Sequence, residues 1–337
     1  MTGKQRVTAA FKGEVADCIP VYPITGQCNA QLVGATIKEF LLDPKVFVNA
    51  QLASYERFRP DIIVMMADLL MEVEALGNKL KFPDDGMCIS ETFSLEEKGN
   101  LARLSLPDPR KDARMPNYLE ACTETRKLIT DIPVSGVIAG PWSIAIGLRG
   151  ATELLKDSMK DREYVYELME FTTKVAISFG EAVRETGVGL TYSEAPASCS
   201  LISPKTYKAF IFPYHKQIID HFKERRVSVG LHICGYTDPI LEDMVATGAS
   251  NISIDAPSNL AKAMQAAKGR AVVIGNVNTN LFFLGKREEM EQAVRSCLEV
   301  SGWGSGYILS TGCEVPAIAP PEKVEWFMEA ARRLGKR

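Results

Sequence analysis

The segment Val227-Ser-Val-Gly-Leu-His-Ile-Cys234 has the alternation of a β-strand, with an aliphatic residue at every second position. Side chains two residues apart on a strand point to the same face, so His232 and Cys234 share one face. Imidazole and thiolate together are ligands that suit zinc. The segment therefore predicts a strand that ends in two potential metal ligands.

Seven other segments have the pattern of short strands buried on both faces, and helical patterns separate most of them. They are residues 18–24, 61–68, 132–140, 188–194, 251–255, 271–276 and 307–310. Eight strands alternating with helices predict an α/β fold, a (β/α)8 TIM barrel with an N-terminal helical extension. An open, doubly wound sheet is the alternative, but no Gly-x-Gly-x-x-Gly follows the first strand.

Helices are expected between these strands, at 44–58, 116–130, 141–185 in three pieces, 203–223, 238–246, 258–267, 287–300 and 320–334. Residues 78–115 are rich in proline and glycine turns and predict a less regular excursion. The chain shows no internal repeat, low-complexity tract or linker. We therefore expect residues 1–337 to form one barrel domain.

The composition excludes several functional classes. The formal charge is −3 and basic residues are not concentrated, which argues against nucleic acid as a partner. No apolar run approaches the roughly 20 residues of a membrane span, and the first residues lack the apolar core of a signal peptide. The 8 cysteines have no paired spacing and predict reduced thiols, so a cytoplasmic protein is expected.

Polar residues collect at one end of the predicted strands. In a barrel the carboxyl ends of the strands form the active site, so this regularity indicates an enzyme. The residues at these ends are Asp68, Glu194, His232, Cys234, Asp255, Asn276, Asn278 and Cys313.

Cys313 follows the last predicted strand and is expected to complete a site with His232 and Cys234. Three protein ligands leave one position open, which is typical of catalytic zinc. Glu194 is a candidate fourth ligand or a base near the metal. Asp255 is a candidate catalytic residue, although it is equally well explained as the cap of a helix that begins near Ser258.

These residues and several short motifs resemble the uroporphyrinogen decarboxylase superfamily over nearly the whole chain. The motifs are Met66-Ala-Asp68, Glu74-Ala-Leu-Gly77, Ile138-Ala-Gly-Pro-Trp-Ser143, Leu201-Ile-Ser-Pro204, His232-Ile-Cys-Gly235, Ile254-Asp255, Gly275-Asn276 and Thr311-Gly-Cys313. The decarboxylases carry an arginine-rich motif after the first strand, which holds the substrate's carboxylates. Here that place reads Tyr22-Pro-Ile-Thr-Gly-Gln-Cys-Asn-Ala30, without arginine, although Asp68 matches the position of their catalytic aspartate.

The His-x-Cys…Cys pattern is instead similar to that of the zinc-dependent methyltransferases of the superfamily. This resemblance implies zinc held by His232, Cys234 and Cys313 and a corrinoid carried by a partner protein. Asp68, Glu194 and Asp255 remain the candidate catalytic residues from their positions at the strand ends. The implied reaction moves a methyl group between cobalt and a small molecule, either a methyl ether or a thiol such as coenzyme M. A decarboxylase and a non-catalytic corrinoid- or metal-binding accessory protein remain as alternatives.

The substrate pocket is expected to include Tyr22, Met65, Met66, Tyr192 and Asn276. A carboxylate at position 68 would repel a sulfonate, which favours a neutral or phenolic methyl donor.

Overall fold

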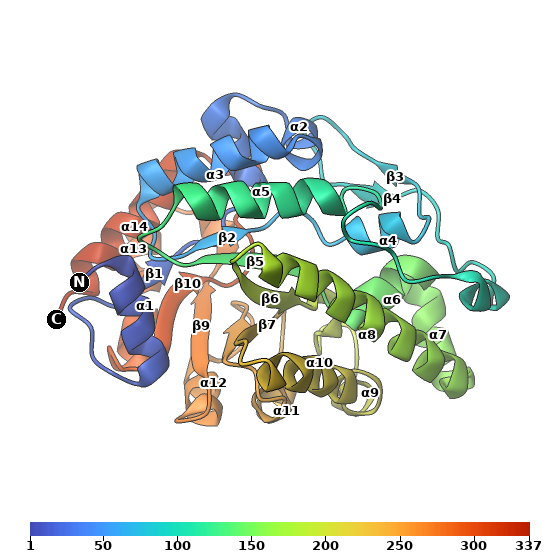
Figure 1. Ribbon diagram of the computed structural model, residues 1–337. Helices are drawn as coiled ribbons and strands as arrows, with labels where there is room; N and C mark the ends of the chain where they lie inside the picture. The colour runs from blue at the N-terminus through green and yellow to red at the C-terminus, as the bar shows by residue number, and fades with distance from the viewer.

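Eight parallel strands form a nearly closed barrel in the computed structural model, which describes residues 1–337 (Figure 1). They are β1 (Val21–Tyr22), β2 (Ile63–Met65), β5 (Val134–Ala139), β6 (Gly189–Ser193), β7 (Val229–Ile233), β8 (Asn251–Ile254), β9 (Val272–Val277) and β10 (Tyr307–Thr311). From β2 through β5 to β10, each barrel strand pairs with the next barrel strand in the chain, and β10 then pairs with β1. This order confirms the barrel, since a doubly wound sheet reverses direction at its centre.

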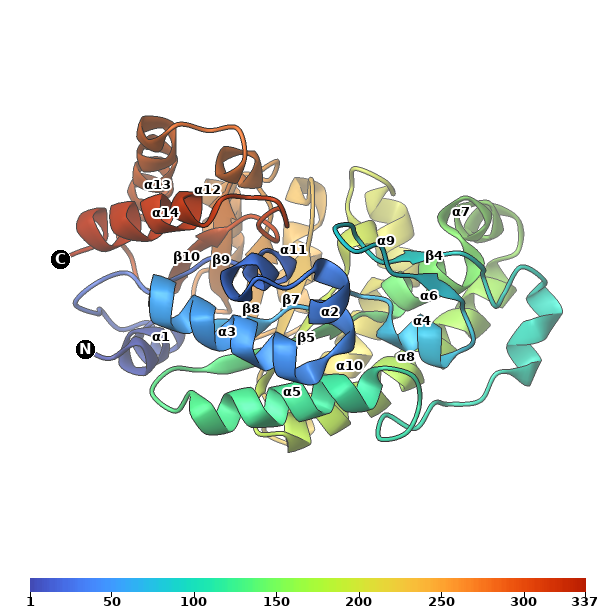
Figure 2. The same cartoon turned by 90° about the horizontal axis from the view of Figure 1, so that it is seen from above.

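Helices follow the strands and pack around the sheet (Figures 1 and 2). They are α1 (Gly3–Lys12), α2 (Ile37–Leu42), α3 (Pro44–Phe58), α4 (Met71–Ala75), α5 (Met115–Leu128), α6 (Pro141–Arg149), α7 (Ala151–Lys160), α8 (Arg162–Glu185), α9 (Pro204–Phe210), α10 (Phe212–Glu224), α11 (Leu241–Ala246), α12 (Leu260–Ala267), α13 (Arg287–Ser301) and α14 (Pro321–Leu334). None of them is both long enough and apolar enough to cross a membrane.

Two of the predicted helices differ from the structure. The helix expected at 203–223 is broken at Ile211 into α9 and α10, because Pro213 lies in the first turn of α10 and has no N–H to continue the helix. The helix expected from 258 begins at Leu260, and its cap is Asn259, whose side chain accepts from the Lys262 N–H. Asp255 is therefore not the cap of this helix.

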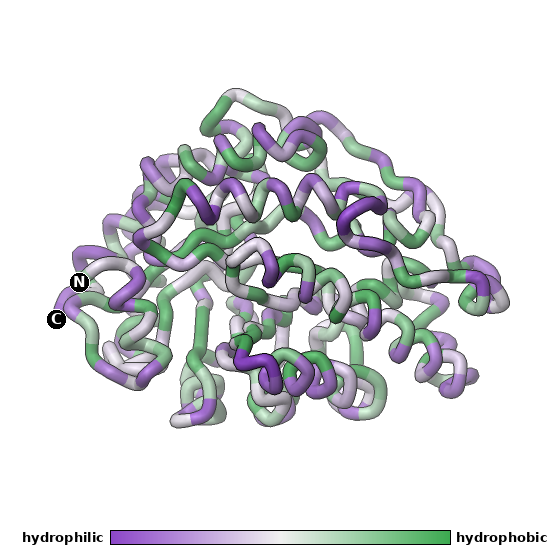
Figure 3. Tube along the Cα trace, viewed as in Figure 1, coloured by the Kyte–Doolittle hydropathy of each residue, from purple (hydrophilic) through white to green (hydrophobic).

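The apolar side chains form two separate layers. A cluster of 10 buried residues lies inside the barrel, and it includes Val64 and Val137 from the strands together with Val7 and Ala10 from α1. The N-terminal helix thus packs against the barrel's inner layer. A larger cluster of 83 residues fills the space between strands and helices, and in Figure 3 the helices accordingly alternate between hydrophilic and hydrophobic segments.

The excursion between β2 and α5 contains a short antiparallel pair, β3 (Leu80–Lys81) and β4 (Ile89–Ser90), and a 3-10 turn at Lys98–Arg103. Because it follows the carboxyl end of β2, it lies over that end of the barrel. It brings Met87 and Cys88 to the cavity described below.

Asp61 bridges the gap between β1 and β2, which are not paired as strands. Its carboxylate accepts from the Val21 N–H at 2.8 Å, and its own N–H donates to the Val21 carbonyl at 2.8 Å. The same carboxylate pairs with Arg6 of α1 at 3.2 Å and Arg332 of α14 at 2.7 Å. One buried side chain therefore ties the first two strands to both terminal helices.

We expect Asp61→Ala to lower the free energy of unfolding by about 3–5 kcal/mol, because it leaves the buried Val21 N–H without an acceptor and removes the carboxylate that joins Arg6 to Arg332. Asp17→Ala is the matched control, since Asp17 pairs with the same Arg6 but is largely exposed. Its expected cost is below about 1 kcal/mol. Urea denaturation followed by circular dichroism measures both, and equal losses would contradict the role of Asp61.

Candidate active site

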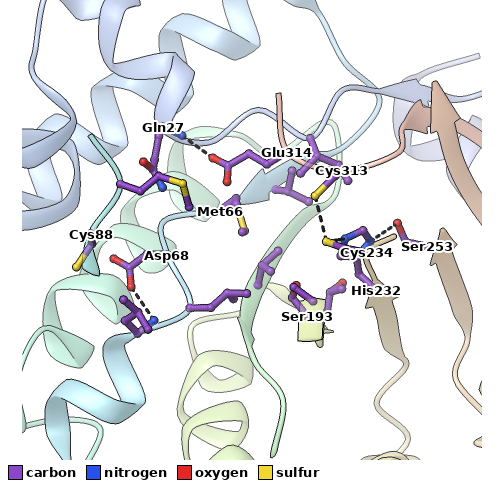
Figure 4. Close-up of a pocket in the computed structure, with 18 of the residues that line it drawn as sticks. Gln27, Met66, Asp68, Cys88, Ser193, His232, Cys234, Ser253, Cys313 and Glu314 are labelled. Atoms are coloured by element: carbon purple, nitrogen blue, oxygen red, sulfur yellow. Dashed lines mark hydrogen bonds between the residues drawn. The ribbon is translucent and has the colours of Figure 1, made fainter. Parts of the chain in front are cut away.

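His232, Cys234 and Cys313 converge at the carboxyl ends of β7 and β10, and their ligand atoms all lie within 4.8 Å of one another. His232 Nε2 is 3.1 Å from the Cys234 sulfur, which is 3.1 Å from the Cys313 sulfur (Figure 4). Cys313 follows Cys234 by 79 positions in the chain, so the closure of the barrel brings the two cysteines together. The structure thus assembles the three predicted ligands.

Two glycines allow the loops that carry the cysteines to meet. Gly235 has φ 67°, a left-handed conformation that turns the chain directly after Cys234. Gly312 lies against the loop after β8, where a Cβ would be 2.6 Å from both the Ala256 nitrogen and a carboxylate oxygen of Asp255. A side chain at position 312 would push Cys313 away from Cys234.

Ser253 orients the imidazole of His232. The two residues are register partners on β7 and β8, and His232 Nδ1 is 2.9 Å from the Ser253 hydroxyl. With Nδ1 protonated, the ring donates to Ser253 and keeps the lone pair of Nε2 toward the sulfurs. A fixed partner on the second ring nitrogen is typical of metal-ligating histidines.

The donor set fits zinc. In a tetrahedral zinc site, nitrogen and sulfur ligand atoms lie about 3.5–3.8 Å apart, close to the separations within this cluster. The Cys234 and Cys313 sulfurs share a hydrogen bond, which lowers the pKa of Cys313 and raises that of Cys234. His232, Cys234 and Cys313 would hold the ion, since no other histidine, cysteine or acidic side chain joins the group.

A cavity of about 380 Å³ opens beside the cluster and is lined by 20 residues. The sulfur cluster lies at one end, Asp68 and Cys88 lie at the other, and Met66 lies between them (Figure 4). Much of the remaining wall is aliphatic, contributed by Ile24, Val64, Leu69, Leu70 and Val137. The cavity is therefore an apolar chamber with soft ligands at one end.

Asp68 is held in a buried ion pair with Arg114. Arg114 Nη1 donates to Asp68 at 2.7 Å, and Arg114 Nε donates to Glu74 at 2.7 Å. The side chains of Arg114 and Asp68 are each 7% exposed. Asp68 therefore reaches the cavity as a carboxylate whose charge is already compensated.

Glu314, next to Cys313, forms another part of the wall. Its carboxylate accepts from the Gln27 N–H at 2.9 Å, and burial raises its pKa to about 8. Sequence reasoning missed Glu314, Gln27, Ser253 and Arg114. Glu314 directly follows Cys313 at the end of a strand, and this position could have indicated it from the sequence. Ser253 is found only from the register of β7 and β8, and Gln27 and Arg114 only from how the chain folds back on the site.

The structure corrects two of the predicted pocket residues. Tyr22 and Met66 line the cavity, but Met65 and Tyr192 do not. Both point outward, since Met65 belongs to the outer core and the Tyr192 hydroxyl donates to the Ala176 carbonyl of α8 at 2.7 Å. Their neighbours of opposite parity, including Val64 and Thr191, face the cavity instead.

Glu194 is not brought to the cysteines. It is fully buried, and its carboxylate accepts from the Trp142 and Ser143 N–H groups at 3.0 and 2.8 Å, in the first turn of α6. His215 Nε2 lies 3.1 Å from the same carboxylate. A carboxylate at a helix N-terminus with a buried imidazole beside it is a structural clamp, so the placement argues against a fourth ligand.

Asp255 and Asn276 shape the site without lining the cavity. Asp255 accepts from the Gly235 N–H at 2.8 Å, which fixes the turn after Cys234. Asn276 donates to the Asp255 and Ser258 carbonyls at 3.1 and 2.9 Å. Both residues therefore contact the loops around the cluster and not the cavity.

Comparison with known proteins gives matches along the whole chain. The family model described as uroporphyrinogen decarboxylase (URO-D) matches residues 2–334. Methylcobamide:CoM methyltransferase MtaA of Methanosarcina barkeri is 27% identical over 98% of this chain and 97% of its own length. Uroporphyrinogen decarboxylase of Edwardsiella ictaluri is 26% identical over 82% of this chain and 80% of its own length. A solved methyltransferase from Methanosarcina mazei has a TM-score of 0.89 at 25% identity, covering 99% of both chains.

Glu72 of α4 is a buried carboxyl group that the sequence did not single out. It is fully buried, one oxygen accepts from the Ala139 N–H at 3.0 Å, and the other has no partner. Burial raises its pKa from 4.5 to about 8. The folded protein therefore holds a proton on Glu72 at neutral pH that the unfolded chain releases.

Because the folded pKa is the higher one, the stability from the protonated form is complete below pH 4.5 and is lost as pH rises through about 8. Glu72→Gln mimics the neutral acid, so we expect the variant to equal wild type at pH 4.5 and to exceed it by on the order of 3 kcal/mol at pH 9. Urea denaturation across this pH range measures the difference. Parallel pH profiles for the two proteins would contradict the assignment.

Proposed function

Since the chain belongs to the uroporphyrinogen decarboxylase family, we propose that it is one of its zinc-dependent methyltransferases. It moves a methyl group between a small molecule and the cobalt of a corrinoid protein. The observation that carries this proposal is the convergence of His232 Nε2 and the sulfurs of Cys234 and Cys313 within 4.8 Å at the cavity. MtaA, which is similar over the whole chain, is a methylcobamide:CoM methyltransferase.

Two thiolates and a neutral imidazole balance the charge of a divalent ion and leave one coordination position for substrate. When bound, zinc supplies a Lewis acid that lowers the pKa of a thiol substrate or polarises the oxygen of an ether. Ser253 holds the histidine ring, Asp255 holds the turn after Cys234, and the aliphatic walls exclude water from the reacting atoms. The corrinoid contributes the redox-active centre and the chain contributes position and charge.

In the proposed transfer to cobalt, the bond between the methyl carbon and the sulfur or oxygen breaks, and the sulfur or oxygen keeps the electron pair. The methyl carbon forms a bond to cobalt, and cobalt supplies the two electrons of this bond as Co(I) becomes Co(III). Transfer to a thiol is the reverse of these steps.

The loops at the carboxyl ends of the strands suit a large partner. The loops that follow β6, β9 and β10 expose large apolar side chains, Leu201 at 62%, Leu284 at 75% and Ile318 at 63%. Exposed apolar side chains on one end of a barrel can serve as a protein-binding surface. They support a corrinoid protein that docks over the cavity.

A porphyrinogen decarboxylase is less well supported by the cavity. The loop after β1 has no arginine, and Arg114, the arginine beside Asp68, is buried against Asp68 and Glu74. A substrate with many carboxylates would enter without a counter-charge. The small volume of about 380 Å³ also favours a small molecule.

Purified protein should contain about one zinc per chain, because three ligands converge at one point. We expect the double variant Cys234→Ala, Cys313→Ala to lose it. Cys297→Ala, another buried free cysteine, and Glu194→Gln are expected to retain the metal. Elemental analysis of protein prepared without a polyhistidine tag measures the ratio, and full zinc in the double variant would remove the basis of the proposal.

The zinc-loaded protein should convert cob(I)alamin to methylcobalamin with a donor from a panel of methyl ethers and methyl thiols. The loss of the Co(I) absorption band measures this conversion. Uroporphyrinogen should not be turned over. Decarboxylation without zinc would favour the decarboxylase. Corrinoid-protein binding without methyl transfer from any donor would favour an accessory protein.

A further inference from the structure

We propose that the cavity binds an uncharged methyl substrate with an apolar body, a thiol, thioether or ether, and disfavours substrates that carry an anionic group. This inference rests on the proposed function and names its substrate class. It separates this chain from relatives that act on coenzyme M, a thiol with a sulfonate at its far end.

The cavity wall offers no cation to an anionic substrate. None of its 20 residues is lysine or arginine, whereas Asp68 and Glu314 are carboxyl groups. A sulfonate that leaves water needs a cationic partner or several free N–H donors. The backbone N–H of Gln27 already donates to Glu314 at 2.9 Å, and its side-chain amide donates to the Ala67 carbonyl at 3.1 Å.

Arg114 does not fill this role. Its guanidinium donates to Asp68 and Glu74, each at 2.7 Å, and also to the Leu41 carbonyl at 3.4 Å. It lies behind Asp68 and is not part of the cavity wall. Two carboxylates thus share one guanidinium, and the local charge at this end of the cavity is not positive.

A cationic group is not favoured at the Asp68 end either. Asp68 is already paired with Arg114, so a cation at this end would lose its hydration for a carboxylate that it must share with a guanidinium. Met66 lies between Asp68 and the sulfurs (Figure 4), and Val64 and other aliphatic side chains also line the cavity. Such walls favour an apolar body between the reacting atom and the Asp68 end.

The volume sets the size of that body. About 380 Å³ is close to the lower end of the roughly 300–1,000 Å³ common for ligand pockets. A small alkyl or aryl group attached to the sulfur or oxygen fits this space.

Binding of three thiols of similar length to the Co(II)-substituted protein tests the proposal without any turnover. They are 1-propanethiol, which is neutral, cysteamine, which is cationic, and 2-mercaptoethanesulfonate, which is anionic. Titration of the thiolate-to-cobalt absorption band gives each dissociation constant. We expect 1-propanethiol to bind at least about tenfold more tightly than 2-mercaptoethanesulfonate, and more tightly than cysteamine.

Equal or tighter binding of 2-mercaptoethanesulfonate or cysteamine would overturn the proposal while leaving the metal site intact. Failure of the protein to take up cobalt, or of every thiol to change the band, would overturn the proposed function and this inference with it. The two failures are therefore distinguishable.

Asp68→Asn provides a second, independent arm. The variant leaves Arg114 with one carboxylate partner, so we expect the affinity for 2-mercaptoethanesulfonate to rise at least about fivefold and that for 1-propanethiol to stay within about twofold. Asp157→Asn is the matched control, because Asp157 forms an equally buried pair with Arg149 and does not line the cavity. Unchanged sulfonate affinity in Asp68→Asn, or the same gain in Asp157→Asn, would contradict the electrostatic account.

Discussion

The pleat of the eight parallel strands is the constraint on which the site depends. It turns alternate side chains into the barrel, so His232 and Cys234 face the cavity while Leu231 and Ile233 pack outward among the larger core. The same parity brings Ser253 on β8 beside His232. Closure of the barrel then brings Cys313 on β10 within reach of β7. None of these contacts is local in the chain.

Charge compensation is the second organising feature. The cavity contains two sulfur ligands, an imidazole and two carboxyl groups, yet its one nearby guanidinium is already paired with Asp68 and Glu74. Glu194 also follows a barrel strand, but its carboxylate is hydrogen-bonded to the N-terminus of α6 and to His215. Acidic residues at the strand ends thus have separate tasks. Some border the cavity, and others hold the surrounding elements in place.

The backbone is shared with the solved methyltransferase from Methanosarcina mazei, as the TM-score of 0.89 describes. Within such a barrel, the wall opposite the His232, Cys234 and Cys313 cluster decides which charge a ligand can carry, because a single cation there would favour an anionic ligand. In this chain that wall is aliphatic around a compensated aspartate.

The eight strands, most helices and the three residues of the His-Cys-Cys cluster could be predicted from the sequence, because each of these follows from local periodicity or from rare residue types. It did not determine which face of a fully buried strand looks inward. Met65 and Met66, or Thr191 and Tyr192, cannot be told apart by hydrophobicity when both faces of a strand are buried. The partners of Glu194, Asp68 and His232 lie on other elements, so they are known only once the chain is folded. A side chain's role here depends on what the closed barrel places within about 3 Å of it, and local sequence does not contain that distance.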